Sequence, residues 1–518
     1  MTSAAGRVGA GLAGARESRP IRPLERIHVV GAAGAGASAA AILAAHAGAV
    51  VSGCDPGGPS PYSSAVEALG IAVAGEHATA HVTNPPRPER LGVTKALTAI
   101  DPDNAELAAA RAAGIPVEPW QQVVADAAVG RTLVGVAGTH GKSTTSGWLV
   151  HALVAAGMDP SALVGALLPG TLTGGPPATA RRGDGPAFIV EADEYAGNFD
   201  PYRPDLAVLT SVEWDHPDVF VDRAAVSDAF EGWLRRMPAG STLVANVGDP
   251  GVEAVVDRLL ALPIRIVAYA LVDTSPGRGG YLRGVRERFT SAAGPAAALL
   301  GRIAAADPDG TTLEVYGLDE LAGAVTVRLG TAGRHNAANA LAVAGASAAL
   351  GLTPAAISSG LGSFSGVGRR LERVGEAAGV VVYDDYGHHP TAIRETLGAI
   401  RQREPGRRVW AVYEPLTYHR TAAMLGAFAD VLADADAVAI ADIWAGRDPD
   451  TTITSAAALA EAVNARRPGI PVLAPGSVEA TADALAGQVR AGDAVLVMGG
   501  GHSYRIGERL LASLEERR

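Results

Sequence analysis

One short stretch of the chain carries residue types that could bind the phosphates of a nucleotide. Residues 134–145 read VGVAGTHGKSTT, so glycines, a lysine and hydroxyl residues follow a short apolar run. In such a turn between a strand and a helix, backbone N–H groups approach phosphate oxygens, Lys142 balances their charge and Ser143 can ligate Mg²⁺. The usual phosphate loop has another glycine five residues before Gly141, where this chain has Val136. The match is therefore partial, and a glycine-rich turn without a ligand is the alternative.

Lysine is scarce in this chain, which makes its place in the loop informative. The 43 basic residues include two lysines, Lys95 and Lys142. An ammonium is a compact point charge and a guanidinium a planar fork, so arginine does not readily replace lysine in a phosphate loop. A lysine at position 142 of so arginine-rich a chain favours nucleotide binding.

A second glycine-rich turn lies near the N-terminus. Residues 26–31 predict a buried strand, residues 38–47 a helix, and residues 49–55 a second strand that ends in Asp55. A glycine turn followed by an acid about 20 residues later is typical of the βαβ unit that binds dinucleotides, although the spacing is not G-x-G-x-x-G. The pattern predicts a nucleotide diphosphate site, and a Rossmann-like domain without a ligand is the alternative.

Acidic residues and a histidine follow two further apolar runs. Residues 188–194 (FIVEADE) end in three carboxylates, and residues 207–216 (AVLTSVEWDH) end in an acid and His216. Catalytic groups of α/β sheets lie just past the carboxyl ends of the strands. Mg²⁺ prefers oxygen ligands, and a histidine can join them. We therefore expect a magnesium site near the phosphate loop; the alternative is that these are solvated loop acids.

The pattern along the chain predicts an α/β protein with three domains. A length of 518 residues corresponds to about three domains, and strands alternate with helices along most of the chain. We expect a flexible tail over residues 1–23, a Rossmann-like N-terminal domain over 24–129, a central P-loop ATPase-like α/β domain over 130–365 and a C-terminal Rossmann-like α/β domain over 366–518.

Two segments carry weaker local signals. The apolar residues 96–100 are predicted to end a strand. Residues 271–315 are rich in proline, glycine and arginine and are predicted to consist largely of loops.

Composition excludes several classes of protein. The net charge of −11 argues against a general nucleic-acid binder, which needs a basic surface. The single cysteine, Cys54, excludes an intramolecular disulfide and fits a reducing cytosol. The chain has no apolar run of 18 residues and no apolar signal core near Met1. We expect a cytoplasmic protein with small-molecule partners, no nucleic acid and no membrane span.

With these residues placed, the sequence resembles the Mur ligase family along nearly its whole length. The motifs that carry the resemblance are Gly138–Thr144, Glu191–Glu194, Asp215–His216, Gly333–Asn336, Gly366–Arg370 and Asp384–Pro390. Val136 in place of glycine is also usual in that family. The first-domain residues 27–31 and 52–55 are most similar to the branch that adds alanine.

The resemblance implies an ATP-dependent ligation in peptidoglycan synthesis. ATP phosphorylates the lactyl carboxylate of UDP-N-acetylmuramate, and the amine of L-alanine attacks the acyl phosphate. The implied cofactors are ATP and Mg²⁺. We expect a monomer or homodimer, since the sequence does not distinguish the two. The first domain binds the UDP-sugar, the central one ATP, and the C-terminal one the amino acid.

The resemblance also implies roles for individual residues. The implied catalytic residues are Lys142, Glu191, His216, His388 and Arg420, and the metal ligands are Ser143, Glu191 and His216. The implied ATP-binding residues are Gly138, Thr139, His140, Gly141, Lys142, Ser143, Thr144, His335, Asn336, Asn339, Arg369 and Asp384. The implied UDP-sugar-binding residues are Gly31, Gly34, Ala35, Gly36, Ser38, Asp55 and His77. The implied amino-acid-binding residues are Tyr386, His388 and Arg420.

Three other readings remain open. A ligase that attaches a recycled tripeptide to the same UDP-sugar shares most motifs, but it normally lacks the Tyr418-x-Arg420-Thr421 pattern of this chain. A P-loop protein that uses ATP for movement leaves the site at Asp55 without a purpose. A nicotinamide oxidoreductase built on the first domain leaves the phosphate loop unused.

Overall fold

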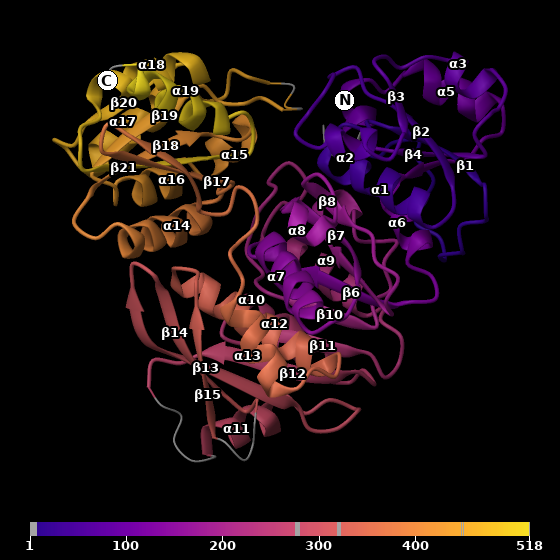
Figure 1. Cartoon of the computed structure of the whole chain (residues 1–518), viewed down its shortest axis with the longest axis horizontal. Coiled ribbons are helices and arrows are strands. Elements are labelled where there is room, and N and C mark those ends of the chain that lie inside the picture. Colours follow the sequence, from indigo (N-terminus) through magenta and orange to yellow (C-terminus); the bar gives the residue numbers. More distant parts are fainter. Residues whose placement is uncertain (1–7, 275–279, 319–322, 447, 449, 517–518) are drawn as a thin grey trace.

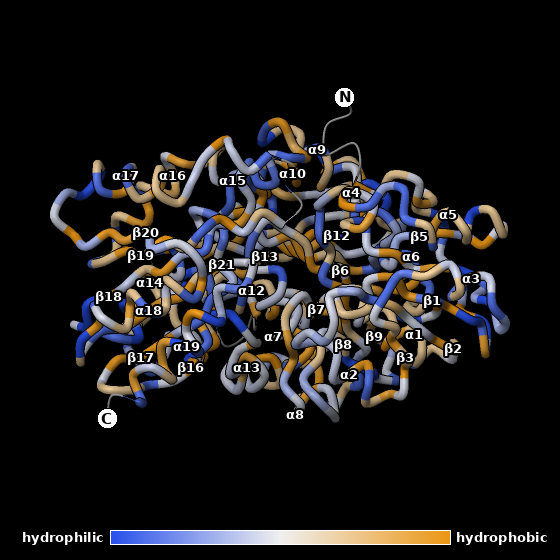
Figure 2. Tube along the Cα trace, turned by 90° about the horizontal axis from the view of Figure 1, so that it is seen from above, coloured by the Kyte–Doolittle hydropathy of each residue, from blue (hydrophilic) through white to orange (hydrophobic). Residues whose placement is uncertain are grey.

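Three β-sheets, one after another along the chain, organise the molecule (Figure 1). The computed structural model describes residues 8–274, 280–318, 323–446, 448 and 450–516. Seen from above, the part built on the central sheet lies between the N-terminal and C-terminal parts (Figure 2). The predicted α/β class with three parallel-rich sheets is confirmed. Among the described residues, no helix is long and apolar enough to span a membrane.

The first sheet forms the N-terminal part and has five parallel strands in the order β3-β2-β1-β4-β5. The glycine turn after β1 leads directly into a helix, as the sequence predicts. The strands are β1 (Arg26–Val30), β2 (Val50–Cys54), β3 (Ala72–Ala74), β4 (Arg90–Val93) and β5 (Val117–Pro119). The helices are α1 (Ala35–His46), α2 (Ser63–Glu67), α3 (Ala80–Thr83), α4 (Lys95–Ile100), α5 (Ala105–Ala112) and α6 (Trp120–Ala127).

The central sheet has ten strands in the order β15-β14-β13-β12-β11-β10-β6-β9-β7-β8. Its strands are β6 (Thr132–Ala137), β7 (Ser161–Leu168), β8 (Ala178–Arg181), β9 (Ala187–Glu191), β10 (Leu206–Leu209), β11 (Thr242–Asn246), β12 (Arg265–Leu271), β13 (Ala297–Asp307), β14 (Gly310–Tyr316) and β15 (Ala324–Leu329). Its helices are α7 (Lys142–Ala155), α8 (Gly170–Thr173), α9 (Arg223–Leu234), α10 (Pro250–Leu259), α11 (Gly280–Arg288), α12 (Arg334–Ala349) and α13 (Pro354–Gly362), with a 3-10 turn at Tyr195–Gly197. Because β6 pairs in parallel with both β9 and β10, the three strand ends expected to carry chemistry are neighbours.

The third sheet has six strands in the order β16-β17-β21-β18-β19-β20, parallel except for β16. Its strands are β16 (Glu372–Ala377), β17 (Val380–Asp385), β18 (Arg408–Glu414), β19 (Ala437–Ala441), β20 (Val472–Gly476) and β21 (Asp493–Gly499). Its helices are α14 (Pro390–Arg403), α15 (Tyr418–Ala423), α16 (Leu425–Leu432), α17 (Ala456–Arg466), α18 (Val478–Gln488) and α19 (Tyr504–Glu515).

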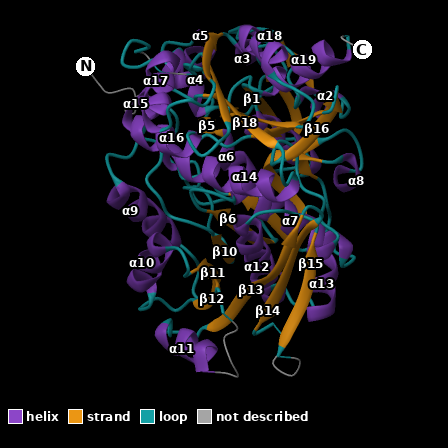
Figure 3. Ribbon diagram, turned by 90° about the vertical axis from the view of Figure 1, so that its left-hand side faces the viewer, coloured by secondary structure: helices purple, strands orange, loops and turns teal. Residues whose placement is uncertain are grey.

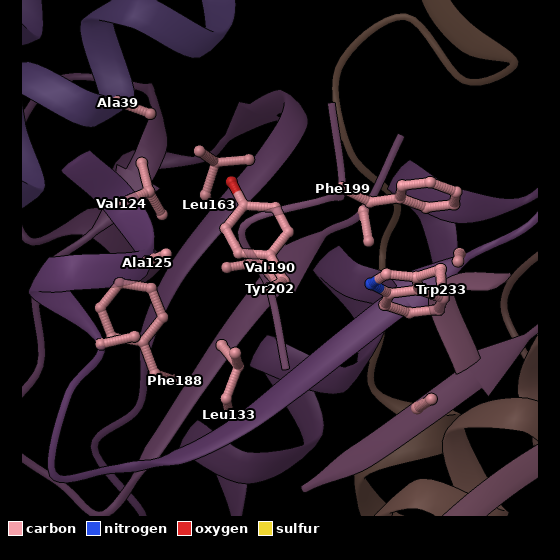
Figure 4. Close-up of a cluster of buried hydrophobic side chains, with 14 of the residues drawn as sticks. Ala39, Val124, Ala125, Leu133, Leu163, Phe188, Val190, Phe199, Tyr202 and Trp233 are labelled. Carbon is pink, nitrogen blue, oxygen red and sulfur yellow. The ribbon is translucent and has the colours of Figure 1, made fainter. Parts of the chain in front are cut away.

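Apolar cores lie on both faces of the central sheet. Helices α9 and α10 cover one face, and α7, α12 and α13 cover the other (Figure 3). The first of these cores continues into the N-terminal part, so that Ala39 of α1 and Val124 of α6 lie near Leu163 and Phe188 of the central sheet (Figure 4). This shared core joins the N-terminal part to the strands that carry the phosphate loop.

We expected a flexible tail over residues 1–23, but residues 8–23 contact the N-terminal part. Arg16 Nε lies 2.7 Å from Glu118 Oε1, and Arg16 Nη2 lies 2.6 Å from Asp126 Oδ2. Both carboxylates are buried, so the arginine supplies charge that they need. Residues 1–7 lie outside the described residues.

The two weaker local predictions are wrong. Residues 95–100 form α4, because β4 ends at Val93 and the following alanines and leucine are good helix formers. Residues 271–315 contain α11 and the antiparallel pair β13–β14, which turns at the sequence DPDG over residues 307–310. That tetrapeptide is a strong turn signal, and Leu313 and Val315 alternate with polar residues in the strand that follows it.

Candidate active site

The phosphate loop lies at the carboxyl end of β6, directly before α7. Gly138 has a φ of +136°, and a Cβ added there would lie 2.2 Å from Thr210 Oγ1. Gly141 has a φ of +80°, and its Cβ would lie 2.5 Å from Asn339 Oδ1. Side chains are therefore excluded at both positions, and the free N–H groups that begin α7 can meet a phosphate.

Lys142 lies among carboxylates at the start of α7. Its Nζ donates to Gly138 O at 2.7 Å and to Glu194 Oε2 at 2.9 Å, and it lies 3.7 Å from Asp193 Oδ1. Burial alone would lower the pKa of Lys142, but Glu194 and Asp193 outweigh it and raise the pKa. The lysine is therefore a permanent cation at the phosphate loop.

Ser143 connects the loop to two other parts of the molecule. Its Oγ donates to Glu191 Oε1 at 2.9 Å, at the end of β9, and accepts from Arg370 Nη2 at 2.9 Å. The structure thus brings together Ser143 and Glu191, two of the predicted metal ligands. Arg370 belongs to the C-terminal part, so this hydrogen bond connects that part to the phosphate loop.

Asp193, Glu194 and His216 form a second group of metal-type ligands. One ligand atom from each lies within 4.8 Å of those of the others. Glu194 Oε1 is buried and accepts no hydrogen bond from the described residues, and burial raises the pKa of Glu194. An unsatisfied buried carboxylate oxygen beside an imidazole fits a divalent cation.

Arg420 of α15 reaches across from the C-terminal part to this group. Its Nη2 lies 2.7 Å from Asp215 Oδ1 and 3.0 Å from His216 Nδ1. This contact leaves His216 Nε2 facing Glu194 Oε1 at 3.9 Å. Burial, reinforced by the Arg420 cation, holds the pKa of His388 well below its usual range, so that this imidazole is neutral.

A cavity of about 320 Å³ opens beside the phosphate loop. Its lining includes the loop residues His140, Gly141, Ser143 and Thr144 and, from the start of α12, His335, Asn336 and Asn339. Asn339 Nδ2 donates to Asn336 Oδ1 at 3.3 Å, and Asn336 Nδ2 donates to Ala332 O at 2.8 Å. These amides are therefore held in place at the wall of a space next to the phosphate-binding turn, where a nucleoside would lie.

Of the expected ATP-binding residues, Arg369 and Asp384 from the C-terminal part do not line this cavity. Arg369 Nε donates to Asp384 Oδ2 at 2.9 Å, and its Nη2 donates to Gly499 O and Ser503 Oγ, both at 2.9 Å. The cavity is instead lined by the next residues in each motif, Arg370 and Asp385. The Tyr386 ring lies under both guanidinium groups, with centroid distances of 5.3 Å for Arg369 and 5.0 Å for Arg370.

The glycine turn of the N-terminal part has room for a ligand at one of its glycines. A Cβ at Gly34 would meet one atom, Gly31 O, at 3.3 Å. A Cβ at Gly36 would lie 2.2 Å from the Trp120 ring, so Gly36 allows α1 and α6 to pack closely. Asp55 Oδ2 accepts from Ala33 N at 3.0 Å, which ties the acid to the turn.

Ser38 and His77, which were expected to bind the UDP-sugar, form polar contacts with other residues of the chain. Ser38 Oγ donates to Ala35 O at 3.0 Å and lies 3.3 Å from Thr179 Oγ1 of β8. His77 Nδ1 lies 3.2 Å from Cys54 Sγ. Ala35 and Ser38 therefore lie at the junction with the central sheet, and His77 lies beside the end of β2.

Profiles of known families match the chain over three consecutive regions. Residues 26–132 match "Mur ligase family, catalytic domain", residues 136–347 "Mur ligase middle domain", and residues 369–501 "Mur ligase, glutamate ligase domain". The chain belongs to the Mur ligase family. Relatives named UDP-N-acetylmuramate–L-alanine ligase include one from Kineococcus radiotolerans, 38% identical over 91% of this chain and 92% of its own. Another, from Gloeobacter violaceus, is 36% identical over 92% of this chain and 93% of its own.

Solved structures share the fold of this Mur ligase. A UDP-N-acetylmuramate–alanine ligase from Thermotoga maritima has a TM-score of 0.74 at 20% identity and covers 95% of this chain and 100% of its own. A murein peptide ligase from Psychrobacter arcticus has a TM-score of 0.67 at 24% identity and covers 95% and 98%.

We predict that His216→Ala weakens the binding of Mg²⁺ to this Mur ligase. Loss of one ligand should raise the Mg²⁺ concentration for half-maximal rate by roughly 10–100-fold, the range seen when metal sites are perturbed. A titration of the rate with Mg²⁺ measures this, with His151→Ala as the control because His151 contacts Ser363 on the outer side of α7. An unchanged titration would make His216 a structural residue.

We predict that Gly34→Val blocks the glycine turn without disturbing the ATP site. A Cβ at Gly34 meets one atom of the protein, Gly31 O, at 3.3 Å. It should raise the KM for the UDP-sugar about tenfold or more, as expected for a lost hydrogen bond to a charged group of about 1.5 kcal/mol. Steady-state kinetics with each nucleotide varied in turn measure the effect, and an equal rise in the KM for ATP would contradict two separate nucleotide sites.

Sequence reasoning missed a further contact between the central and C-terminal parts. Glu213 Oε2 lies 3.2 Å from His140 Nε2 and accepts from Thr391 Oγ1 at 2.7 Å. His389 Nε2 lies 3.1 Å from Trp214 O, and its ring lies 4.6 Å from that of His140. His140 and His389 lie in the motifs at residues 138–144 and 384–390, but no sequence pattern marks Glu213, Trp214 or Thr391, because their partners lie some 175 positions away.

Proposed function

We propose that this Mur ligase joins L-alanine to the lactyl carboxylate of UDP-N-acetylmuramate, with release of ADP and phosphate, in peptidoglycan precursor synthesis in the cytoplasm. The relatives with this name at 36–38% identity over most of the chain support it. The structural observation that carries it is the meeting of Lys142, the Glu194–His216 pair and Arg420 at one point. The reaction brings the phosphates of ATP, a carboxylate and an amine together, so it requires cations and ligand groups that meet in one place.

The first step transfers the γ-phosphoryl group of ATP to the lactyl carboxylate. Two anions must meet, so fixed positive charge between them lowers the barrier. Lys142 supplies that charge at the phosphate loop. Ser143, Glu191 and the Glu194–His216 pair would hold Mg²⁺, which would supply further positive charge against the charge that develops on the phosphoryl group.

The second step joins the amine to the acyl phosphate. The amino nitrogen of L-alanine must lose a proton before it attacks the carbonyl carbon, and phosphate leaves as the amide forms. His388 is neutral, and its Nδ1 lies 3.0 Å from Tyr386 O, so its Nε2 can accept a hydrogen bond that orients the amine while the proton passes to solvent. Arg420 and Tyr386 would hold the substrate carboxylates on the side of the C-terminal part.

A competition assay tests the proposed amine substrate. Equal concentrations of L-alanine and L-Ala-γ-D-Glu-diaminopimelate are offered with UDP-N-acetylmuramate, ATP and Mg²⁺, and both products are measured. We expect product from L-alanine, with glycine and serine as slower substrates because one methyl group is worth only about 1–3 kcal/mol. Faster consumption of the tripeptide would favour the recycling ligase instead.

A further inference from the structure

Four metal-ligand side chains meet in the N-terminal part, away from the ATP cavity. His28 lies on β1, Cys54 ends β2, His81 lies on α3 and Glu106 on α5. Ligand atoms of all four lie within 4.8 Å of one another. His28 Nε2 lies 3.0 Å from Glu106 Oε1 and 3.4 Å from Cys54 Sγ. Cys54 Sγ lies 3.3 Å from Glu106 Oε2, and His81 Nδ1 lies 3.1 Å from Glu106 Oε1.

These four side chains are buried, so the negative charge of the Glu106 carboxylate must be balanced by a positive charge nearby. Glu106 and Cys54 have no exposed surface, and His28 is 3% exposed. The Cys54 thiol donates a hydrogen bond to the Glu106 carboxylate within this buried group. The proposed ligase reaction uses none of these four side chains.

We propose that His28, Cys54, His81 and Glu106 bind one Zn²⁺ ion. Thiolate, imidazole and carboxylate are all zinc ligands. Four contacts between their donor atoms measure 3.0–3.4 Å, counting either oxygen of Glu106, and one ligand atom of each lies within 4.8 Å of the others, so the group can close around a tetrahedral ion with bonds of about 2.0–2.3 Å. The ion displaces the proton of the Cys54 thiol to solvent, and the S–H bond gives way to an S–Zn bond. Two anionic ligands then balance the dication, which removes the net charge from the buried site.

The surroundings of the four side chains favour a transition metal over Mg²⁺. A thiolate is a softer ligand than Mg²⁺ accepts in proteins, and one carboxylate among a thiolate and two imidazoles offers fewer oxygen ligands than Mg²⁺ prefers. His28 Nδ1 lies 2.8 Å from Ser52 Oγ, which orients the ring with Nε2 toward the site. The side chains of His77 and His81 are 15% and 20% exposed, so an ion can enter from that side. The bound ion would connect β1, β2, α3 and α5 and stabilise the N-terminal part.

Cobalt substitution of the full chain tests the proposal with a readout independent of ligase activity. After removal of metals with a chelator, Co²⁺ is added in the presence of excess Mg²⁺, and the absorption spectrum is recorded. We expect one tightly bound cobalt ion with an intense visible spectrum of tetrahedral type and an ultraviolet thiolate-to-cobalt band. Cys54 is the sole cysteine, so that band can arise only from this site. Zinc added afterwards should abolish both signals and raise Tm.

Matched variants locate the ion. His81→Asn should weaken zinc affinity by at least about 10–100-fold, and Cys54→Ser should remove the ultraviolet band, with circular dichroism showing that both remain folded. His46→Asn is the control, because His46 lies in the same part and faces Gly183 and Asp184. Cobalt binding without the thiolate band, binding that His81→Asn leaves unchanged, or no binding of zinc at micromolar concentration would overturn the proposal.

Discussion

Replacing Lys142 by alanine should slow the formation of ADP by at least about 10²–10³-fold, the cost of removing one fixed charge-stabilising group from an active site. The Nζ of Lys142 is held between Gly138 O and Glu194 at the start of α7. Removal of this cation leaves the phosphoryl group and two nearby carboxylates without compensating charge. The rate is measured as release of ADP and phosphate that depends on both UDP-N-acetylmuramate and L-alanine.

Two further variants make the result specific to position 142. Lys142→Arg should also be severely impaired, because a planar guanidinium cannot occupy the place of the ammonium between the loop carbonyl and the carboxylate. Lys95→Ala, which removes the other lysine of the chain, should keep most of the activity, since Lys95 Nζ donates to the carbonyl of Ala196. Retention of more than about a tenth of the rate by Lys142→Ala, where a loss of orders of magnitude is expected, would contradict its role.

Replacing Arg420 by methionine should both destabilise the protein and nearly abolish ligation. Burial would raise the pKa of Asp215, but His216 and Arg420 outweigh it and hold that pKa well below its usual range. Removing one partner of a buried ion pair costs about 3–5 kcal/mol of the free energy of unfolding. The variant also loses the contact that orients His216, so the rate should fall about as far as for a lost active-site group, by ~10²-fold or more.

A double-mutant cycle separates these two effects. Asp215→Asn combined with Arg420→Met should recover part of the lost stability, because no unpaired charge is left buried, but it should not recover the rate. Chemical denaturation gives the free energies, and equal recovery of stability and rate would mean that Arg420 acts through folding alone.

The same pair predicts how stability depends on pH. The folded-state pKa of Asp215 is lower than that of an unfolded aspartate, about 3.9. Its contribution is therefore fully present above that value and is lost as the pH falls below it. The difference in unfolding free energy between the native protein and Asp215→Asn should shrink as the pH is lowered below about 4. A difference that stays constant over this range would show that Asp215 is not held as an ion by Arg420.

The sequence by itself determined the α/β class, the two glycine turns and the strand ends that surround the phosphate loop. These features depend on local patterns: an apolar run, a glycine that must adopt positive φ, and a helix that begins directly after it. Lys142 and Ser143 are fixed by the loop they belong to, so their place could be predicted without knowing the rest of the chain. The antiparallel strands β13 and β14 could also have been predicted, from the DPDG turn.

Only the tertiary structure decided which side chains from distant segments meet. Arg369 has a φ of +56° and turns toward Asp384, while the adjacent Arg370 faces Ser143. A one-residue change of direction in an irregular loop has no signature in the sequence. Contacts such as that of Arg420 with Asp215, and of Cys54 with Glu106, depend on how far each element extends and how the sheets are placed. Long-range packing sets the length of each element and the placement of the sheets, so only the tertiary structure decides which partners the buried charges have.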